Sequence, residues 1–313
     1  WAWMGISVVA RRGRFGGTSP VSSSSRELGE RALLDSEPNA PQGEALDIGH
    51  ALAELGIDIR VRGSNDYKDM EGSDLVIVTA GFPRKPGMTR EELVGKNAEV
   101  IKSVAENIKK YAPNSTVIVT TNPLDPMIYL AYKLLKFPRE RVIGFSGILD
   151  SRRLAYYASK KLGVAPSSIT PVVIGQHGEK MFPVPRLSTV AGVPLVQIMT
   201  QKDIEEIVRS TIDAGAEVTK LRGFSSNWAP GAGLALMAES IKRDLKRTFF
   251  ASVYLDGEYG LKDITVNVPV VLGRKGVEKI LELPLTEEER KGFLESVEAI
   301  KANLAQIPPE YFK

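Results

Sequence analysis

The chain has 313 residues, of which 43% are hydrophobic and 25% charged, and its formal net charge is +3. This composition is typical of a globular protein with room for two domains, and so small a net charge argues against a nucleic-acid or membrane partner. The chain has no cysteine, which excludes disulfides, thiolate metal sites and cysteine nucleophiles, and only two histidines, His50 and His177.

The N-terminus argues against a secretory signal. Its first residues, WAWMGISVVARRGRF, place apolar residues before the arginines, whereas a secretory signal begins with its basic region. No apolar run reaches the roughly 18 to 20 residues that cross a bilayer. We therefore expect a cytoplasmic protein with no membrane anchor.

Six apolar runs in the first half predict buried strands, at 5–9, 31–36, 58–64, 74–81, 116–123 and 141–147. Near-continuous apolar runs bounded by turn residues are typical of strands that are buried on both faces. Amphipathic helices are predicted between them, for example over 42–55 and 90–111. This alternation predicts an α/β fold with a doubly wound parallel sheet, a dinucleotide-binding (Rossmann) domain, over residues 1–147.

The second half, residues 148–313, has a different order of elements. Helices are predicted over 149–162, 202–221, 229–246 and 285–305, and strands near 170–175, 252–256 and 263–271. This order predicts a mixed α/β domain, which we expect to carry the substrate site.

One segment does not fit this scheme. Residues 17–26, GTSPVSSSSR, lie where the first crossover helix is expected, but four consecutive serines and Pro20 are poor helix material. A flexible linker is the simplest interpretation of the composition, yet a linker has no obvious place between two strands of one sheet.

A glycine-flanked histidine, His177 in VVIGQHGEK, follows a predicted strand. Histidine is the usual general acid or base near neutral pH, although a lone histidine is more often structural. Asp150 and Arg153, in GILDSRR, are three residues apart and share a helix face. They form either a local ion pair or a functional pair, in which the carboxylate orients a histidine and the guanidinium binds a substrate carboxylate through two hydrogen bonds.

Two loops at predicted strand ends carry further polar residues. The loop TAGFPRKPGMTR contains Arg84, Lys85 and Arg90, and it is either a solvated basic loop or a lid whose arginines meet an anionic substrate and exclude water. Asn122, in TTNPLD, ends the next strand, where ligands bind in open α/β sheets. Its amide could donate to a substrate oxygen; an asparagine–proline turn is the alternative.

Four motifs, TAGFPRKPGMTR, TTNPLD, GFSGILDSRR and IGQHGEKMFPVPRLSTVAGVPL, together resemble the malate/lactate dehydrogenase family, and most of all its lactate-dehydrogenase-like, archaeal-type malate dehydrogenases. The resemblance extends from about residue 30 to the C-terminus. It implies an oxidoreductase that moves a hydride between NAD and a small 2-hydroxy dicarboxylic acid, with malate as substrate and a place in the tricarboxylic acid cycle. It also implies a homodimer or homotetramer without a catalytic metal.

The resemblance implies a role for each motif residue. His177 matches the catalytic acid/base, Asp150 its carboxylate partner, and Arg153 the arginine that binds the C1 carboxylate of the substrate. Arg90 matches the lid arginine that polarises the reacting carbonyl, and Asn122 the asparagine that bonds the substrate oxygen.

Further positions concern specificity and the cofactor. Arg84 matches the position that reads the far end of the substrate, where malate enzymes carry arginine and lactate enzymes usually glutamine; a C4 carboxylate would pair with it. Asn97 and Asn122 are expected at the cofactor site, and Ser225 or Ser226 falls where the family has a small residue facing the substrate. We expect a structural role for His50.

The nucleotide loop departs from the family pattern. In ARRGRFGG, Gly13 and Gly16 match the second and third glycines of G-x-G-x-x-G, but Arg11 stands in place of the first. Asp35 follows Gly13 by 22 residues, near the ~20 residues expected for an acid that bonds the adenosine ribose. Such an acid favours NAD over NADP, because it repels a 2′-phosphate; a strand-end turn residue is the alternative.

Three other interpretations stay open. The first is a dehydrogenase for lactate or a longer 2-hydroxy acid, which Arg84 disfavours. The second is a catalytically impaired nucleotide-binding relative, which Arg11 and the serine run favour. The third is a sugar-phosphate or glycosidase-like relative, which would need a metal site that two distant histidines do not suggest. We expect residues 10–26 to weaken cofactor binding, whether they reflect a compensated reading-frame error or genuine divergence.

Overall fold

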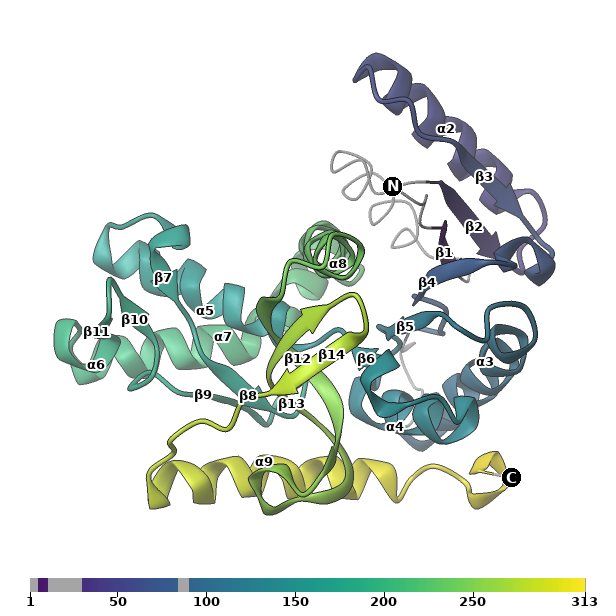
Figure 1. Ribbon diagram of the computed structural model, residues 1–313. Coiled ribbons are helices and arrows are strands. Elements are labelled where there is room, and N and C mark those ends of the chain that lie inside the picture. Colours follow the sequence, from purple (N-terminus) through teal and green to yellow (C-terminus); the bar gives the residue numbers. More distant parts are fainter. Residues whose placement is uncertain (1–4, 11–29, 84–89, 313) are drawn as a thin grey trace.

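The computed structural model describes residues 5–10, 30–83 and 90–312, without the side chains of Arg31 and Arg90. Two α/β halves lie side by side, and the long C-terminal helix α9 (Glu287–Leu304) runs along both of them (Figure 1). The predicted helix over 17–26 and the lid residues 84–89 lie outside the described residues. Within the described ranges, no helix is both long and apolar enough to cross a membrane.

The first half forms the predicted parallel sheet. Its strands are β1 (Gly5–Ala10), β2 (Arg31–Asp35), β3 (Val61–Ser64), β4 (Ser73–Val78), β5 (Thr116–Val119) and β6 (Val142–Gly144), and they lie in the order β3-β2-β1-β4-β5-β6. This is the strand order of a dinucleotide-binding sheet, so the predicted fold class is confirmed.

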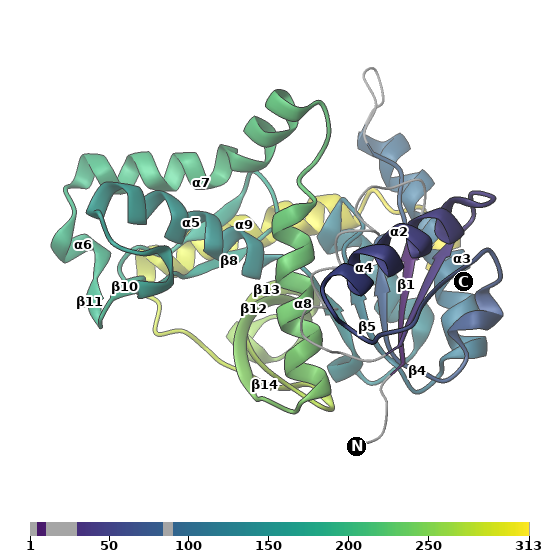
Figure 2. The ribbon, with the colours of Figure 1, turned by 90° about the horizontal axis from the view of Figure 1, so that it is seen from above.

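Helices cover both faces of this sheet, which explains why its strands are apolar throughout. Successive strand residues point to opposite faces. Ile6 and Val8 therefore belong to the core that includes helix α2 (Ala40–Glu54), whereas Val9 packs in the core of helices α3 (Arg90–Tyr111) and α4 (Leu124–Leu135). Figure 2 shows these helices against the strands from above.

The second half is the mixed α/β part. Its helices are α5 (Gly147–Leu162), α6 (Leu195–Ile198), α7 (Gln201–Arg222), α8 (Trp228–Lys242) and α9. Its strands are β7 (Ile169–Thr170), β8 (Val173–Gly175), β9 (Met181–Pro183), β10 (Thr189–Val190), β11 (Val193–Pro194), β12 (Arg247–Asp256), β13 (Lys262–Gly273) and β14 (Gly276–Ile280).

One sheet continues from the first half into the second. Strand β12 lies antiparallel to β6, with Ser252 opposite Gly144, and the sheet goes on through β13, β8 and β9. A Cβ atom at Gly144 would lie 1.8 Å from Cδ1 of Ile128 in α4 and 2.8 Å from Cβ of Ser252, so a larger residue would have to displace these side chains. The junction brings the ends of β6 and β8 and the start of α4 close together.

Several predicted element ends are wrong. The strands predicted over 74–81, 116–123 and 141–147 end at 78, 119 and 144, and β3 begins at 61 rather than 58. Residues beyond these ends form loops at the sheet edge, where Thr121 Oγ1 donates to the Ala80 carbonyl, 2.5 Å away. The helix predicted over 229–246 ends at Lys242, because Asp244 and Lys246 have positive φ angles, and β12 then begins at 247 instead of 252. The strand predicted over 170–175 is two short strands, and helix α4 was not singled out by the sequence pattern.

Gly63 of β3 gives a test of the packing between α2 and the sheet. A Cβ atom there would lie 2.0 Å from the Pro41 carbonyl oxygen in the first turn of α2. We expect Gly63→Ala to lower the free energy of unfolding by about 1–3 kcal/mol, since backbone must move to make room. Gly49→Ala, within α2 and with nothing within 4 Å of its added methyl, should instead stabilise the protein by about 0.5–1 kcal/mol. Urea unfolding measures both variants, and equal midpoints for the two would contradict this packing.

Candidate functional site

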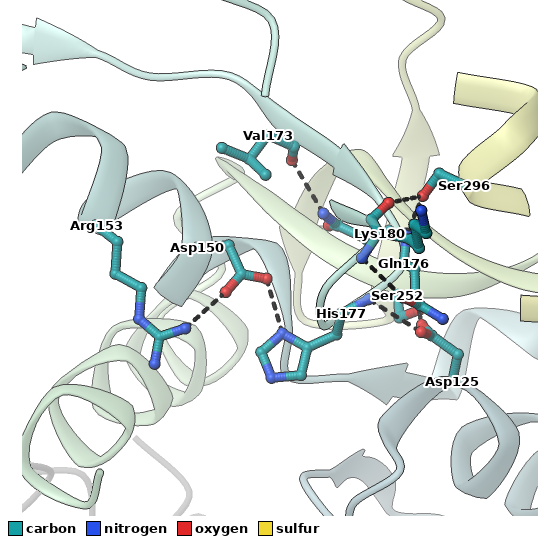
Figure 3. Close-up of polar contacts among 10 residues, drawn as sticks. Asp125, Asp150, Arg153, Val173, Gln176, His177, Lys180, Ser252 and Ser296 are labelled. Carbon is teal, nitrogen blue, oxygen red and sulfur yellow. Dashed lines mark hydrogen bonds and ion pairs between the residues drawn. The ribbon is translucent and has the colours of Figure 1, made fainter. Parts of the chain in front are cut away.

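The site lies where β8 ends beside the carboxyl edge of the parallel strands. Gly175, the last residue of β8, has a φ angle of 85°, and a Cβ atom there would lie 2.3 Å from Ser296 Oγ of α9. Both the positive φ and the close helix require glycine at this position. The turn that follows directs the side chain of His177 toward α5, as Figure 3 shows.

Asp150 contacts both the imidazole of His177 and the guanidinium of Arg153. Its Oδ2 lies 2.7 Å from Nδ1 of His177, and its Oδ1 accepts a hydrogen bond of 3.2 Å from Nη1 of Arg153. The carboxylate of Asp150 is fully buried, whereas the side chains of His177 and Arg153 are 18% and 16% exposed. Among the described residues, Nε2 of His177 forms no hydrogen bond, so this nitrogen is the one left to exchange a proton. Asp150 therefore forms the local ion pair with Arg153 and the contact with His177 at the same time, so the two alternatives given by the sequence do not exclude each other.

The surroundings of His177 favour its protonated form. Burial lowers the pKa of the imidazole, but the negative charge of Asp150 and its hydrogen bond to the ring raise it, and the pKa of His177 is above its ordinary value. Asp125 raises it further and Arg153 opposes the rise. The site therefore stabilises the imidazolium form of His177 relative to a free histidine.

A second buried carboxylate, Asp125 in the first turn of α4, holds the backbone of His177. Its Oδ2 accepts the His177 N–H at 3.0 Å, and its Oδ1 accepts the Ser252 hydroxyl at 2.9 Å. Thr265 Oγ1 donates to the Asp125 carbonyl at 2.9 Å. Burial raises the pKa of Asp125 to about 6. Asp125 belongs to the TTNPLD motif, but its sequence neighbours give no sign of a role, since its partners His177 and Ser252 lie 52 and 127 residues away.

Ser296 of helix α9 fixes both ends of the loop that contains His177. Ser296 Oγ accepts the Gln176 N–H at 2.8 Å and donates to the carbonyl of Lys180. The Lys180 N–H donates to Oε1 of Gln176 at 3.1 Å. The loop is thus held from α4, α5 and α9, and α9 lies more than 100 residues further along the chain (Figure 3).

Asn97 connects two loops at the sheet edge. It is buried in α3, its Oδ1 accepts the Phe82 N–H at 2.7 Å, and its Nδ2 donates to the carbonyls of Phe82 and Asn122, at 3.2 and 2.5 Å. Both donors of the amide are therefore used within the protein. Asn122 lies in the loop beyond β5, with its side chain exposed.

Asp35 ends β2 directly beside Ala10, the last residue of β1. Its Oδ1 accepts the Glu37 N–H at 2.9 Å, and its carbonyl accepts a hydrogen bond from Asn65. The carboxylate thus lies at the carboxyl edge of the sheet, where a dinucleotide binds in this fold, and the position fits an acid that contacts the ribose.

The described part of the chain brings together His177, Asp150 and Arg153. Arg84, the side chain of Arg90, Gly13 and Gly16 lie outside the described residues. Ser225 and Ser226 lie in the connection between α7 and α8, and His50 is exposed on α2.

Comparisons with known proteins cover nearly the whole chain. The family profile of the lactate/malate dehydrogenase NAD binding domain matches residues 4–144, and that of the lactate/malate dehydrogenase alpha/beta C-terminal domain matches residues 148–310. The malate dehydrogenase of Caldivirga maquilingensis is 63% identical over 309 residues, which is 98% of this chain and 100% of that protein.

Solved structures of both enzyme types share the fold. The malate dehydrogenase from Aeropyrum pernix superimposes with a TM-score of 0.95 at 54% identity, covering 98% of this chain and 100% of that one. The Cryptosporidium parvum lactate dehydrogenase complexed with lactic acid and β-nicotinamide adenine dinucleotide has a TM-score of 0.94 at 38% identity, covering 98% of each chain.

The raised pKa of His177 predicts how its contribution to stability depends on pH. A group whose pKa is higher in the folded state stabilises the protein below its unfolded pKa, and this contribution is lost as the pH rises through the folded value. The loss of unfolding free energy in His177→Asn should therefore be larger at pH 6 than at pH 9.5. Urea unfolding of both proteins at each pH measures this difference. A loss that is the same at both pH values would contradict the ion pair with Asp150.

Proposed function

The chain belongs to the lactate/malate dehydrogenase family, and we propose that it is an NAD-dependent malate dehydrogenase, which oxidises (S)-malate reversibly to oxaloacetate. The proposed function rests mainly on the contact of Asp150 with both His177 and Arg153 beside the carboxyl edge of a Rossmann sheet. It joins a proton acceptor, its orienting carboxylate and an anion-binding guanidinium in one site.

Each of these groups has a task that follows from its contacts. Nδ1 of His177 is engaged by Asp150, so Nε2 accepts the hydroxyl proton of malate, and the buried Asp150 stabilises the imidazolium that forms. Arg153, held at Nη1, binds the C1 carboxylate through its remaining donors. When bound, NAD⁺ supplies the acceptor for the hydride that leaves C2. We assign Arg90 to polarising the reacting carbonyl and Asn122 to the substrate oxygen.

The cofactor site combines described and undescribed residues. Asp35, beside the end of β1, is placed to accept hydrogen bonds from the ribose hydroxyls and to repel a 2′-phosphate, which supports a preference for NAD over NADP. Gly13 and Gly16 are assigned to the pyrophosphate loop from the sequence motif alone. Asn97 was expected to face the cofactor; since its amide donors are used within the protein, we assign it to positioning Asn122 and the loop that leads to the lid.

We propose malate rather than lactate as the substrate because of Arg84 and because of the malate dehydrogenases among the similar proteins. One of the two solved structures is named a malate dehydrogenase and the other a lactate dehydrogenase. Both nevertheless superimpose on this chain almost equally well. The backbone therefore does not select the substrate. A cationic side chain at the far end of the substrate does so by pairing with a second carboxylate.

We further propose a nucleotide domain over residues 1–147 and a substrate domain over 148–313, which agree with the ranges of the two family profiles. We propose a homodimer or homotetramer that acts in the cytoplasm within the tricarboxylic acid cycle. Leu46 and Leu55 of α2, which are 64% and 62% exposed, support self-association through this helix.

An assay of the purified protein tests the proposed function. We expect oxaloacetate reduction to exceed pyruvate reduction and NADH to be preferred to NADPH. His177→Asn should lower turnover by about 10²- to 10⁴-fold, the usual cost of losing a general base, while NADH affinity measured by nicotinamide fluorescence stays close to that of the wild type.

The same titration distinguishes the alternative of an impaired relative, which Arg11 in place of the first loop glycine favours. Absence of NADH binding would support that alternative and reject the proposed enzyme. Substantial turnover in His177→Asn would remove this residue from the reaction, whatever the protein binds.

Arg84→Gln tests the specificity assignment. Loss of the cation should cost about 2–5 kcal/mol in kcat/KM toward oxaloacetate and raise the relative rate with pyruvate, because only the dicarboxylate loses a charge partner. Lys85→Gln in the same loop is the matched control and should leave the ratio unchanged. A constant ratio of kcat/KM values in Arg84→Gln would show that this residue does not read the substrate.

A further inference from the structure

Asp125 is a buried carboxylate for which the family assignment given above has no task. It is 1% exposed, and both of its oxygens accept hydrogen bonds inside the protein, from the backbone of His177 and from the hydroxyl of Ser252. Ser252 is itself fully buried on β12, at the point where the sheet crosses between the two halves. The carboxylate is thus part of the structure that holds the catalytic loop.

An ionised carboxylate is energetically unfavourable at this buried position. Taking a negative charge out of water costs free energy unless a cation or several donors compensate for it. An asparagine amide could satisfy the same geometry: its oxygen would accept the His177 N–H, and its NH₂ would donate to the Ser252 oxygen. The hydrogen bonds alone therefore do not explain why the group is an acid, and the difference between the two side chains is the charge.

We propose that Asp125 is a positioning residue that fixes the His177 loop through the backbone N–H, and that its buried negative charge, together with that of Asp150, sets the pH at which His177 exchanges its proton. The part that concerns proton exchange during turnover rests on the proposed function. The effect on the titration of His177 does not.

The charged groups around His177 come from two helices and from its own loop. The charges that act most strongly on it are Asp150 and Arg153 of α5 and Asp125 of α4, while Glu179 and Lys180 follow in its own loop. The charge of Asp125 raises the pKa of His177, as does that of Asp150, whereas Arg153 lowers it. Burial raises the pKa of Asp125 to about 6, while its hydrogen bonds from the His177 N–H and the Ser252 hydroxyl favour the ionised carboxylate.

The two histidines of the chain make a direct test possible. Labelling histidine with ¹³C at Cε1 gives two NMR signals, one from His177 and one from the exposed His50 of α2, and His50→Asn assigns them. Asp125→Asn keeps the hydrogen-bonding geometry and removes the charge. We expect the titration midpoint of His177 to move to lower pH, so that its protonated fraction at a pH above both midpoints falls at least about threefold. The His50 curve should not move.

Two further variants complete the experiment. Thr265→Val removes the hydrogen bond to the Asp125 carbonyl but no charge, and it should leave the His177 curve in place. Ser252→Ala removes a hydrogen bond that favours the ionised form of Asp125, so it should move the His177 midpoint in the same direction by less. This variant decides the question if Asp125→Asn does not fold.

Kinetics supply the second readout. The midpoint of the pH profile of oxaloacetate reduction should move to lower pH in Asp125→Asn, parallel to the NMR titration. An unmoved His177 curve in folded Asp125→Asn, or an equal movement in Thr265→Val, would overturn the proposal. If the NMR midpoint moves but the wild-type protein reduces no oxaloacetate, the proposed function fails while the effect of Asp125 on His177 stands.

Discussion

Asp150 receives the ring of His177 on one carboxylate oxygen and the guanidinium of Arg153 on the other, at a position without access to water. A buried carboxylate tolerates no loss of partners, since an uncompensated charge inside the protein costs several kcal/mol. The start of α5 must therefore stay in a fixed position relative to the loop after β8. The orientation of the imidazole, the direction of Nε2 and the placement of the anion-binding guanidinium all depend on this one contact.

The continuous sheet explains how segments distant in sequence meet at this contact. Strand β6 leads directly into α5 and pairs with β12, and β13 then carries the sheet to β8, the strand that ends before His177. The same junction places Ser252 against Asp125 of α4, while α9 lies along both halves and reaches the loop through Ser296 (Figure 1). His177 is thus held by buried hydrogen bonds from several elements, an arrangement that preorganises the site for the proton exchange proposed above.

The proposed function assigns substrate choice to a position outside this buried network. Malate and lactate dehydrogenases superimpose on the chain with TM-scores of 0.95 and 0.94, so the two chemistries share one backbone. A hydride acceptor, a proton acceptor and a guanidinium for the C1 carboxylate serve any 2-hydroxy acid. The length and charge of the remaining part of the substrate differ between such acids, and a loop residue can read that difference without disturbing the buried network.

Much of this protein follows from local sequence. Apolar runs predicted the six parallel strands, and helical periodicity predicted the full extent of α3, because burial on both faces and an amphipathic helix each leave a pattern within a few residues. The ordered motifs singled out His177, Asp150 and Arg153, and the structure shows that these three side chains are in contact. Strand ends were less well predicted, since residues such as Thr79 and Thr120 suit a strand as well as the loops at the sheet edge in which they lie. The supporting contacts were decided only by the tertiary structure: Asp125 and Ser296 lie 52 and 120 residues from the backbone groups that they bind, and Asn97 lies 25 residues from Asn122. A hydrogen bond from a single side chain to a distant backbone group leaves no periodic signal, so it exists only once the chain is folded.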